Sequence, residues 1–305
     1  MRSRLTLVAV LFIAAMVTAQ TSGQGGQSQG QGAAKPAAPG NTKKLPEAKT
    51  QEEYNAYKEA ATKKDPAEMA AAAEAFAVKF PNSELREILY VQAMNLYQQS
   101  DNTEREIAMG RKAIAIDPTD PQPLIHVASG LAETTRDTDL DRQDRLNEAA
   151  KDAQAAVDNI DSGLRIPPNV PPEQVAAVKN SIVAMGYETL GVVYINEKKY
   201  AEAEQNLLKA VEAHKASPDA GVYLRLSVAQ DNLGKYQQAL ESANKAAQLA
   251  QPGTVVQSLA KQQQARLQKL VAAGSPSSSA TPAPAPTPAK PATTTQPSTT
   301  TPPPH

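Results

Sequence analysis

The chain has no cysteine and no tryptophan, and aromatic residues make up only 4% of its 305 residues. The absence of cysteine excludes disulfides, thiolate metal sites, a cysteine nucleophile and a lipid-modified cysteine behind a signal sequence. With so few aromatic residues, the core has to be built from Ala, Leu, Val, Ile and Tyr. Small side chains let helix axes approach one another. The composition therefore favours closely packed helices.

The chain also lacks an excess of either charge, with 31 Lys and Arg against 32 Asp and Glu. Nucleic-acid binding needs a basic surface, so we expect no nucleic-acid partner. No Gly-rich phosphate loop follows a strand, no H-E-x-x-H zinc motif occurs, and no serine sits in an elbow between a strand and a helix. We therefore predict no catalytic activity, no cofactor and no metal site.

The three histidines, His126, His214 and His305, lie far apart in the sequence. His126 has apolar neighbours and is predicted to be a packing or surface residue. His214 ends a predicted helix, where its positive charge would interact favourably with the helix dipole. The acidic segment Asp137–Asp144 has irregularly spaced carboxylates, which is typical of a solvated insertion, and weak calcium binding is the alternative.

The first 19 residues have the pattern of a secretory signal peptide. Arg2 and Arg4 provide the positive start, Leu5–Val17 the apolar stretch, and Val17-Thr18-Ala19 the small-residue cleavage motif. We predict cleavage after Ala19 and a periplasmic or secreted protein. The apolar stretch is short for a bilayer-spanning helix, so no stable membrane insertion is expected after cleavage, although an uncleaved anchor is the alternative.

Two segments outside the helical region are predicted to be disordered. Residues 20–45 are rich in Gln, Gly and Pro and contain almost no large apolar side chain, so they form a flexible linker. Residues 275–305 are rich in Pro, Thr and Ser, carry Lys290 as their one charged side chain, and favour extended polyproline-like conformations. Alternatives for this tail are a docking strip for a proline-binding domain or a glycosylated stalk.

Residues 46–274 follow a helical period throughout. Helix starts are marked by the capping box at Thr50–Glu53 and by Asp65-Pro66, and helix ends by signals such as Pro81 and Asp117-Pro118. These signals divide the region into about eleven helices joined by short links. Short links place neighbouring helices antiparallel, so the region is a chain of helical hairpins.

The hairpins repeat a common pattern. The stretch after Tyr187 contains Leu190-Gly191 and then Tyr194 in a first helix, followed by alanines in a second helix. A shift of 36 residues forward or 97 residues back superposes similar residues, and the second-helix alanines or their equivalents are Ala113, Ala203, Ala210, Ala239, Ala243 and Ala246. A glycine in the first helix and alanines in the second allow close approach, so we expect the alanines to be buried between helices.

This pattern resembles that of the tetratricopeptide repeat family. The resemblance implies an all-α fold, a right-handed α-solenoid of antiparallel helix pairs. The approximate units are 50–81, 87–118, 121–161, 184–217 and 220–253, with a capping helix at 254–273. The third unit fits only if about nine residues near Thr134–Leu140 bulge out. The Pro-rich connection Arg165–Pro172 either bends the array or splits it into two lobes.

The resemblance also implies a binding groove lined by the first helix of each unit. The candidate residues are Val91, Asn95, Gln98, Gln99, Glu188, Val192, Ile195, Asn196, Leu224, Val228, Asp231 and Asn232. An amide recurs at Gln99, Asn196 and Asn232, and amides can pair with a peptide backbone whatever its sequence. The alternative is that these amides only end helices and face water.

The expected function is therefore a non-catalytic scaffold of the bacterial envelope that binds a protein or peptide segment. The alternative is a periplasmic chaperone or assembly factor for envelope proteins. It depends on the segment with Phe76, Phe80 and Pro81, which is similar to repeats of periplasmic assembly factors.

Overall fold

The computed structural model describes residues 43–167 and 169–274. The described part contains eleven helices and no strand, as the sequence predicted. The helices are α1 (Gln51–Ala60), α2 (Pro66–Lys79), α3 (Leu85–Gln99), α4 (Thr103–Ile116), α5 (Pro121–Thr134), α6 (Arg142–Asp158), α7 (Pro172–Asn196), α8 (Tyr200–Ala213), α9 (Ala220–Asn232), α10 (Tyr236–Leu249) and α11 (Val255–Gly274). The predicted signal peptide, most of the predicted linker and the predicted tail lie outside the described residues.

Several helices begin at the predicted start signals. The hydroxyl of Thr50 accepts a hydrogen bond from the Glu53 amide at 3.1 Å, and the Glu53 carboxylate accepts one from the Lys49 amide at 2.7 Å. Asp65 accepts bonds from two amides of the first turn of α2, and Asp120 caps α5 in a similar way. These side chains satisfy donors that a helix start leaves without a partner, so the helix boundaries are encoded locally.

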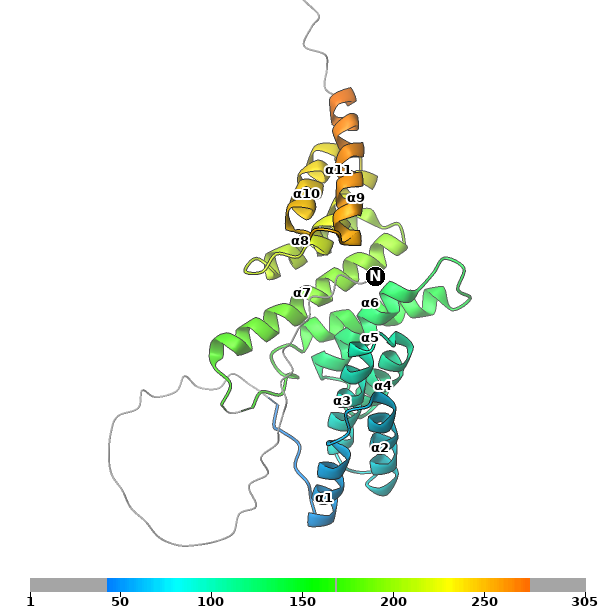
Figure 1. The fold of residues 1–305 in the computed structure, drawn as a ribbon, viewed down its shortest axis with the longest axis vertical. Helices are drawn as coiled ribbons and strands as arrows, with labels where there is room; N and C mark the ends of the chain where they lie inside the picture. Colours follow the sequence, from blue (N-terminus) through cyan, green and yellow to red (C-terminus); the bar gives the residue numbers. More distant parts are fainter. Residues whose placement is uncertain (1–42, 168, 275–305) are drawn as a thin grey trace, which may run out of the picture.

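The helices form two layers (Figure 1). Each odd-numbered helix from α1 to α9 contacts the next odd-numbered helix, so these helices form one continuous layer. Each even-numbered helix packs between two odd-numbered neighbours and contributes to the second layer. The longest helix, α7, crosses the middle of the molecule and contacts α5, α6, α8 and α9. The array is therefore continuous through α7 and does not split after Arg165.

Small residues hold the two layers together. Ala203, Ala210, Ala239 and Ala243 have no exposed surface. A Cβ on Gly191 of α7 would lie 2.6 Å from Cγ of Leu207 on α8, closer than carbon atoms can approach. The predicted burial of these alanines is confirmed, and the close approach of α7 and α8 is possible because Gly191 has no side chain where Leu207 packs against it.

The turns inside the repeats share one backbone conformation. Asp101 and Lys198 have φ of 60°, and Gly234 has φ of 73°. These residues are related by the shifts of 97 and 36 residues that relate the repeats. In each turn, the next amide bonds to a carbonyl five residues back, as in Lys199 to Tyr194 at 2.8 Å. A left-handed residue with this bond is the Schellman ending of a helix. The repeats therefore correspond in backbone geometry as well as in sequence.

The third repeat has a longer connection than the others. Residues 135–141 connect α5 to α6, and Leu140 is fully exposed at this connection. Asp137 pairs with Arg142 at 3.2 Å, and Asp139 accepts a bond from the Arg136 amide at 2.8 Å. The sequence predicts that about nine residues near 134–140 bulge out of the repeat. Residues 135–140 do lie between α5 and α6. Their carboxylates are used in local turn and ion-pair contacts.

A buried ion cluster connects three distant segments at the middle of the array. The Arg165 guanidinium lies 2.8 Å from Glu87, 2.7 Å from Asp120, and in contact with Asp117. Only 8% of the Arg165 side chain is exposed. The cluster joins α3, the α4–α5 connection and the α6–α7 connection. We refer to these four residues and Lys43 as the Arg165 cluster.

Lys43 completes this cluster from the N-terminal segment. Its ammonium group lies 2.6 Å from both carboxylate oxygens of Asp117 and 2.8 Å from the hydroxyl of Thr119, and its backbone pairs with that of Arg165. Burial tends to raise the pKa of Asp117, but the bonds from Lys43 and Thr119 and the charge of Arg165 outweigh it and hold that pKa below its usual range. Lys43, which the sequence placed in the flexible linker 20–45, is thus held in fixed contacts.

Candidate partner-binding surface

The predicted groove residues lie on the layer of odd-numbered helices. Four are on α3, four on α7 and four on α9, and α5 lies between α3 and α7. We call the side of these helices that carries them the odd-helix face. The prediction therefore placed the residues on one layer of the array but omitted the contribution of α5.

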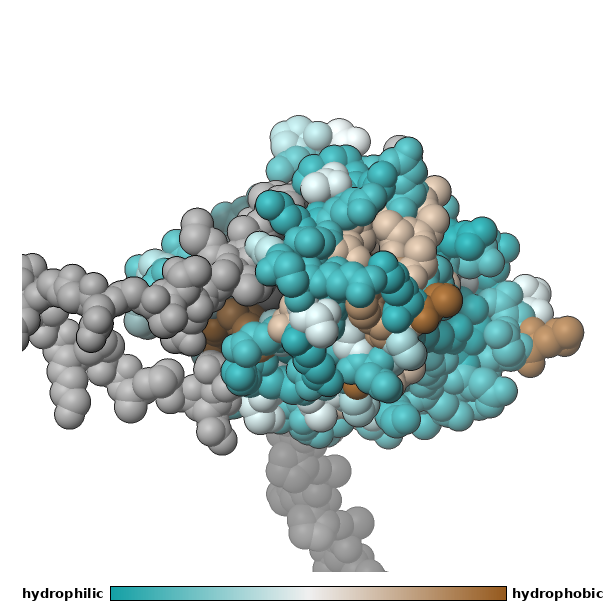
Figure 2. Space-filling model, turned by 90° about the horizontal axis from the view of Figure 1, so that it is seen from below, coloured by the Kyte–Doolittle hydropathy of each residue, from teal (hydrophilic) through white to brown (hydrophobic). Residues whose placement is uncertain are grey.

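The odd-helix face has an apolar component. Its members are half-buried side chains: Val91, Val192, Ile195, Leu224 and Val228. Val91, Val192 and Ile195 pack at their bases against buried clusters inside the array. The exposed parts of these side chains provide apolar contact area without forming a large hydrophobic patch. The view from below in Figure 2 shows a mainly hydrophilic surface that is interrupted by apolar areas.

Several predicted amides are engaged within the protein. Asn95 accepts a hydrogen bond from Gln122 at 3.4 Å, and Gln98 bonds to His126 at 3.1 Å. Asn196 donates to the carbonyl of Ala132 at 3.1 Å. All three bonds run to α5. These amides therefore connect neighbouring odd-numbered helices. Neither of the two roles that the sequence suggested, pairing with a peptide backbone or exposure to water, describes these contacts.

The remaining two amides are exposed at helix ends. Asn232 donates to the carbonyl of Val228 one turn earlier in its own helix at 2.8 Å, and Gln99 is the last residue of α3. Asn232 follows the alternative interpretation, in which the amide ends a helix and faces water. Among the described residues, Gln99 is thus the one recurring amide that is exposed and makes no hydrogen bond to a backbone carbonyl.

An ion-pair network crosses the odd-helix face. Arg225 of α9 lies 2.5 Å from Glu188 of α7 and 3.8 Å from Glu133 at the end of α5. Burial raises the pKa of Glu188, and the charge of Arg225 opposes this change. Arg225 therefore links α5, α7 and α9, which are three successive odd-numbered helices, through its ion pairs. The surface thus carries this charged network beside its apolar residues.

Helix α11 covers one edge of the predicted residues on α9. Asp231 accepts a hydrogen bond from Gln263 at 3.0 Å and forms an ion pair with Arg266. Ala260 and Leu267 are fully buried against the preceding repeat, whereas Val255 and Leu259 are 47% exposed. A helix is thus present where the capping helix was predicted, with apolar residues on both its packed side and its exposed side.

Sequence reasoning missed the α5 residues of this surface. Gln122 and His126 bond to predicted residues of α3, and His126 also lies 3.1 Å from Glu106 of α4. The signal for α5 was weak because its repeat contains the long 135–141 connection. The shifts of 36 and 97 residues skip this repeat.

The fold is thus an all-α array of antiparallel helix pairs. The tetratricopeptide repeat family matches residues 186–215 and 220–252, which are the α7–α8 and α9–α10 pairs. These two segments therefore match tetratricopeptide repeats, and proteins that contain such repeats generally act as scaffolds for protein interactions. No curated protein matches the chain.

Solved structures with a similar arrangement share little sequence with this chain. A MamA protein is 17% identical, with 65% of this chain and 89% of that chain covered and a TM-score of 0.41. A thermophilic TPR protein of Thermus thermophilus is 15% identical, with coverage of 72% and 99% and a TM-score of 0.40. BtubC from P. vanneervenii is 16% identical, with coverage of 82% and 100% and a TM-score of 0.41. At these TM-scores, the functions of those proteins have no bearing on this one.

Two further features are absent from residues 43–167 and 169–274. Those residues include no helix of the length and apolarity needed to cross a bilayer. They also include no group of three or more acidic, His or Cys side chains arranged to hold a metal ion. The odd-helix face remains the principal candidate surface in this part of the chain.

Proposed function

We propose that this protein is a non-catalytic scaffold that binds a segment of another protein on the odd-helix face. The observation that carries the proposal is the combination of two matched tetratricopeptide repeats with a continuous layer of odd-numbered helices. Stacked repeats of this kind create extended binding surfaces. On α9, Leu224 and Val228 are one helical turn apart and provide half-exposed apolar side chains for a partner.

The chemistry of this surface suggests a mixed partner segment. Apolar side chains would contact Val192, Leu224 and Val228, while a polar or charged group would compete for the network of Arg225 and Glu188. An extended peptide or an amphipathic helix meets both requirements. We further propose that the protein acts in the bacterial envelope, because its first 19 residues have the composition of an export signal.

Site-specific photo-crosslinking tests the binding surface. Val228→p-benzoylphenylalanine places the probe on the odd-helix face, and Val78→p-benzoylphenylalanine places it on α2, where Val78 is 82% exposed. We expect a discrete crosslinked partner from the first position only, and its loss when Leu224→Glu is added. Val78→Glu serves as the matched control. Equal crosslinking from both positions would contradict this assignment.

The export proposal and the chaperone alternative are tested separately. N-terminal sequencing of the mature protein is expected to begin at Gln20. The chaperone alternative would be favoured instead if the protein prevented aggregation of many unfolded envelope proteins and lost no activity with Leu224→Glu. In the segment on which that alternative depends, Phe76 is buried, and its ring centroid lies 4.9 Å from that of Phe80 and 6.4 Å from that of Tyr57.

A further inference from the structure

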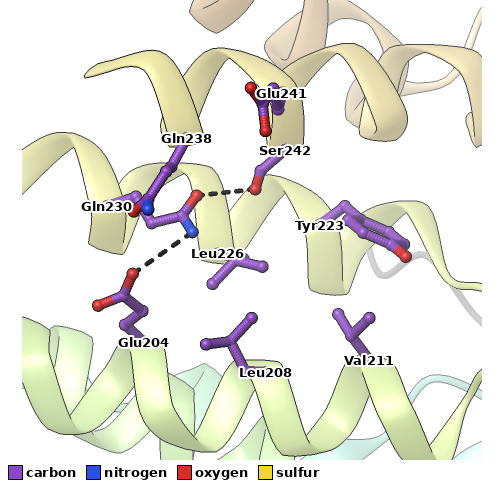
Figure 3. Close-up of a pocket in the computed structure, with 9 residues that line it drawn as sticks. All are labelled: Glu204, Leu208, Val211, Tyr223, Leu226, Gln230, Gln238, Glu241 and Ser242. Carbon is purple, nitrogen blue, oxygen red and sulfur yellow. Dashed lines mark hydrogen bonds between the residues drawn. The ribbon is translucent and has the colours of Figure 1, made fainter. Parts of the chain in front are cut away.

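A second surface feature lies on the opposite layer of the array. A groove of about 380 Å³ opens between α8 and α10, with α9 beneath it (Figure 3). Leu208 and Val211 point into it from α8, and Leu226 from α9. Leu208 is 48% exposed. The groove therefore presents apolar contact area that the helices themselves leave uncovered.

We call this groove between α8 and α10 the outer groove. One of its ends is closed by a polar network. Gln230 donates to Glu204 at 3.4 Å and accepts a hydrogen bond from the Ser242 hydroxyl at 2.7 Å. Lys235 lies 2.5 Å from Glu204 and balances its charge. The other end is bordered by the ring of Tyr223. The groove is thus a short channel with a fixed polar end, an apolar floor and one aromatic side chain.

The edge of the groove carries an unbalanced negative charge. Glu241 accepts a hydrogen bond from Gln237 at 3.3 Å, but in the described part of the chain it pairs with no cation. Gln238 lies beside it with an exposed amide. A ligand that combines compact apolar groups, free carbonyl groups and a positive charge would match these features. Large aromatic or branched side chains would not be required.

The C-terminal segment of the same chain has this chemistry. Residues 275–305 are mainly Pro, Ala, Thr and Ser, and Lys290 is their one charged side chain. Proline rings supply compact apolar surface, and an extended proline-rich backbone leaves its carbonyls available as acceptors. The charge of Lys290 is complementary to that of Glu241.

The position of α11 brings this segment close to the groove. Gln264 of α11 bonds to Asn244 of α10 at 2.8 Å, and Leu267 packs against Ala239 and Ala243. The two helices therefore run antiparallel, and the chain leaves Gly274 near the end of α10 that borders the groove. A proline-rich extended chain spans about 3.1 Å per residue, so this segment is easily long enough to reach the groove.

We propose that the segment 275–305 binds in the outer groove of its own chain, with proline rings on Leu208 and Tyr223 and Lys290 beside Glu241. The segment would cover Leu208 in the free protein. A partner that took its place would have to resemble it in chemistry. This inference concerns the layer opposite the odd-helix face and does not depend on the scaffold function.

Paramagnetic broadening in the full-length protein tests this proposal. The chain has no cysteine, so Thr287→Cys provides one site for a nitroxide label. In protein with labelled Leu and Val methyl groups, we expect the resonances of Leu208 and Val211 to lose more than half of their intensity. The methyl resonances of Val78 should be unchanged. A label at Ser28→Cys is the control for nonspecific contact.

Three substitutions and one mixing experiment decide the outcome. Leu208→Glu should abolish the broadening of Val211, and Lys290→Glu should reduce it, whereas Val78→Glu should leave it unchanged. Circular dichroism and thermal unfolding would verify that Leu208→Glu is folded. Absence of broadening, or its persistence in Leu208→Glu, would overturn the proposal. Broadening in a mixture of nitroxide-labelled and methyl-labelled molecules would show that the segment binds another copy, which also overturns it.

Discussion

Gly163, between α6 and α7, lies directly against the backbone of Thr119, between α4 and α5. A Cβ on Gly163 would be 1.9 Å from the carbonyl oxygen of Thr119 and 2.9 Å from its carbonyl carbon. These atoms belong to backbone and cannot rotate away. The contact is adjacent to the Arg165 cluster, so the two connections are joined by steric fit as well as by charge.

Gly163→Ala is therefore expected to lower the free energy of unfolding by about 2–3 kcal/mol, as overpacking of a fixed contact does. Ser162→Ala is the matched control, because Ser162 is the exposed neighbour and its replacement should change stability by less than about 0.5 kcal/mol. Urea denaturation of both variants provides the measurement. Equal midpoints would mean that the two connections can separate at little cost.

Lys198→Gly is expected to stabilise the protein by about 1 kcal/mol, since a residue with a Cβ is strained in the left-handed conformation. Lys198 has φ of 60°, whereas Gly234 has φ of 73° at the equivalent position. The reciprocal change, Gly234→Lys, should destabilise by a similar amount, because no atom lies within 4 Å of its missing Cβ and only the backbone effect operates. Thermal unfolding of the pair measures both changes, and a loss of stability in Lys198→Gly would refute the argument.

Arg165→Met is expected to cost about 3–5 kcal/mol, because it leaves the buried acidic side chains of Glu87, Asp117 and Asp120 without the guanidinium that they share. Arg111→Met is the control: Arg111 also pairs with a carboxylate, Glu148, but its side chain is 48% exposed. Loss of such a surface pair should cost about 1 kcal/mol or less. Denaturant titration at neutral pH compares the two variants. Similar losses in both would show that the cluster is accessible to water.

The stability of the protein is expected to fall as the pH rises through about 8. Burial and the charge of Asp120 raise the pKa of Glu87 from 4.5 to about 8, although Arg165 opposes this change. The folded protein then binds more protons than the unfolded chain between these values, so stability is fully present below 4.5 and is lost towards 8. Glu87→Gln should remove most of this slope. Unfolding curves collected across that range would reveal a persistent slope if another group were responsible.

His214 should have the opposite effect at low pH. Burial lowers its pKa from 6.5, and neither ring nitrogen has a hydrogen-bond partner among the described residues. The neutral form of His214 therefore contributes to stability above pH 6.5, and this contribution is lost as the pH falls through the lowered pKa of the folded protein. His214→Leu is expected to flatten the acid limb of the stability profile and to add about 1 kcal/mol by removing an unsatisfied polar group. An unchanged acid limb would exclude His214 as its cause.

Local patterns predicted most of the architecture. Ala203 and Ala239 are buried as their repeat positions required, and Thr50 and Asp65 cap helices where their sequence neighbours indicated. These features depend on residues within one turn or one repeat of each other. The helical period and the caps therefore sufficed to predict the helices and their pairing.

Contacts between distant segments could not be predicted in this way. Lys43 meets Asp117 across 74 residues, and no periodic signal relates them. His214 was expected to carry a favourable charge, but the next repeat buries its ring and favours the neutral form. Likewise, the sequence suggested Asn196 as a partner-binding amide. Its bond to the carbonyl of Ala132 could not be predicted, because the two residues are 64 positions apart.

The attachment of Lys43 also determines where a pulling force would enter the molecule. Lys43, the first described residue, is joined to the array at the Arg165 cluster, whereas α11, the last described helix, lies at the far end of the array from α1 (Figure 1). Tension between the two termini would thus load the repeats from α5 to α11 and leave α1 and α2 largely slack. A protein tethered through its N-terminal segment would therefore keep its first two helices packed on α3 and shielded from mechanical stress.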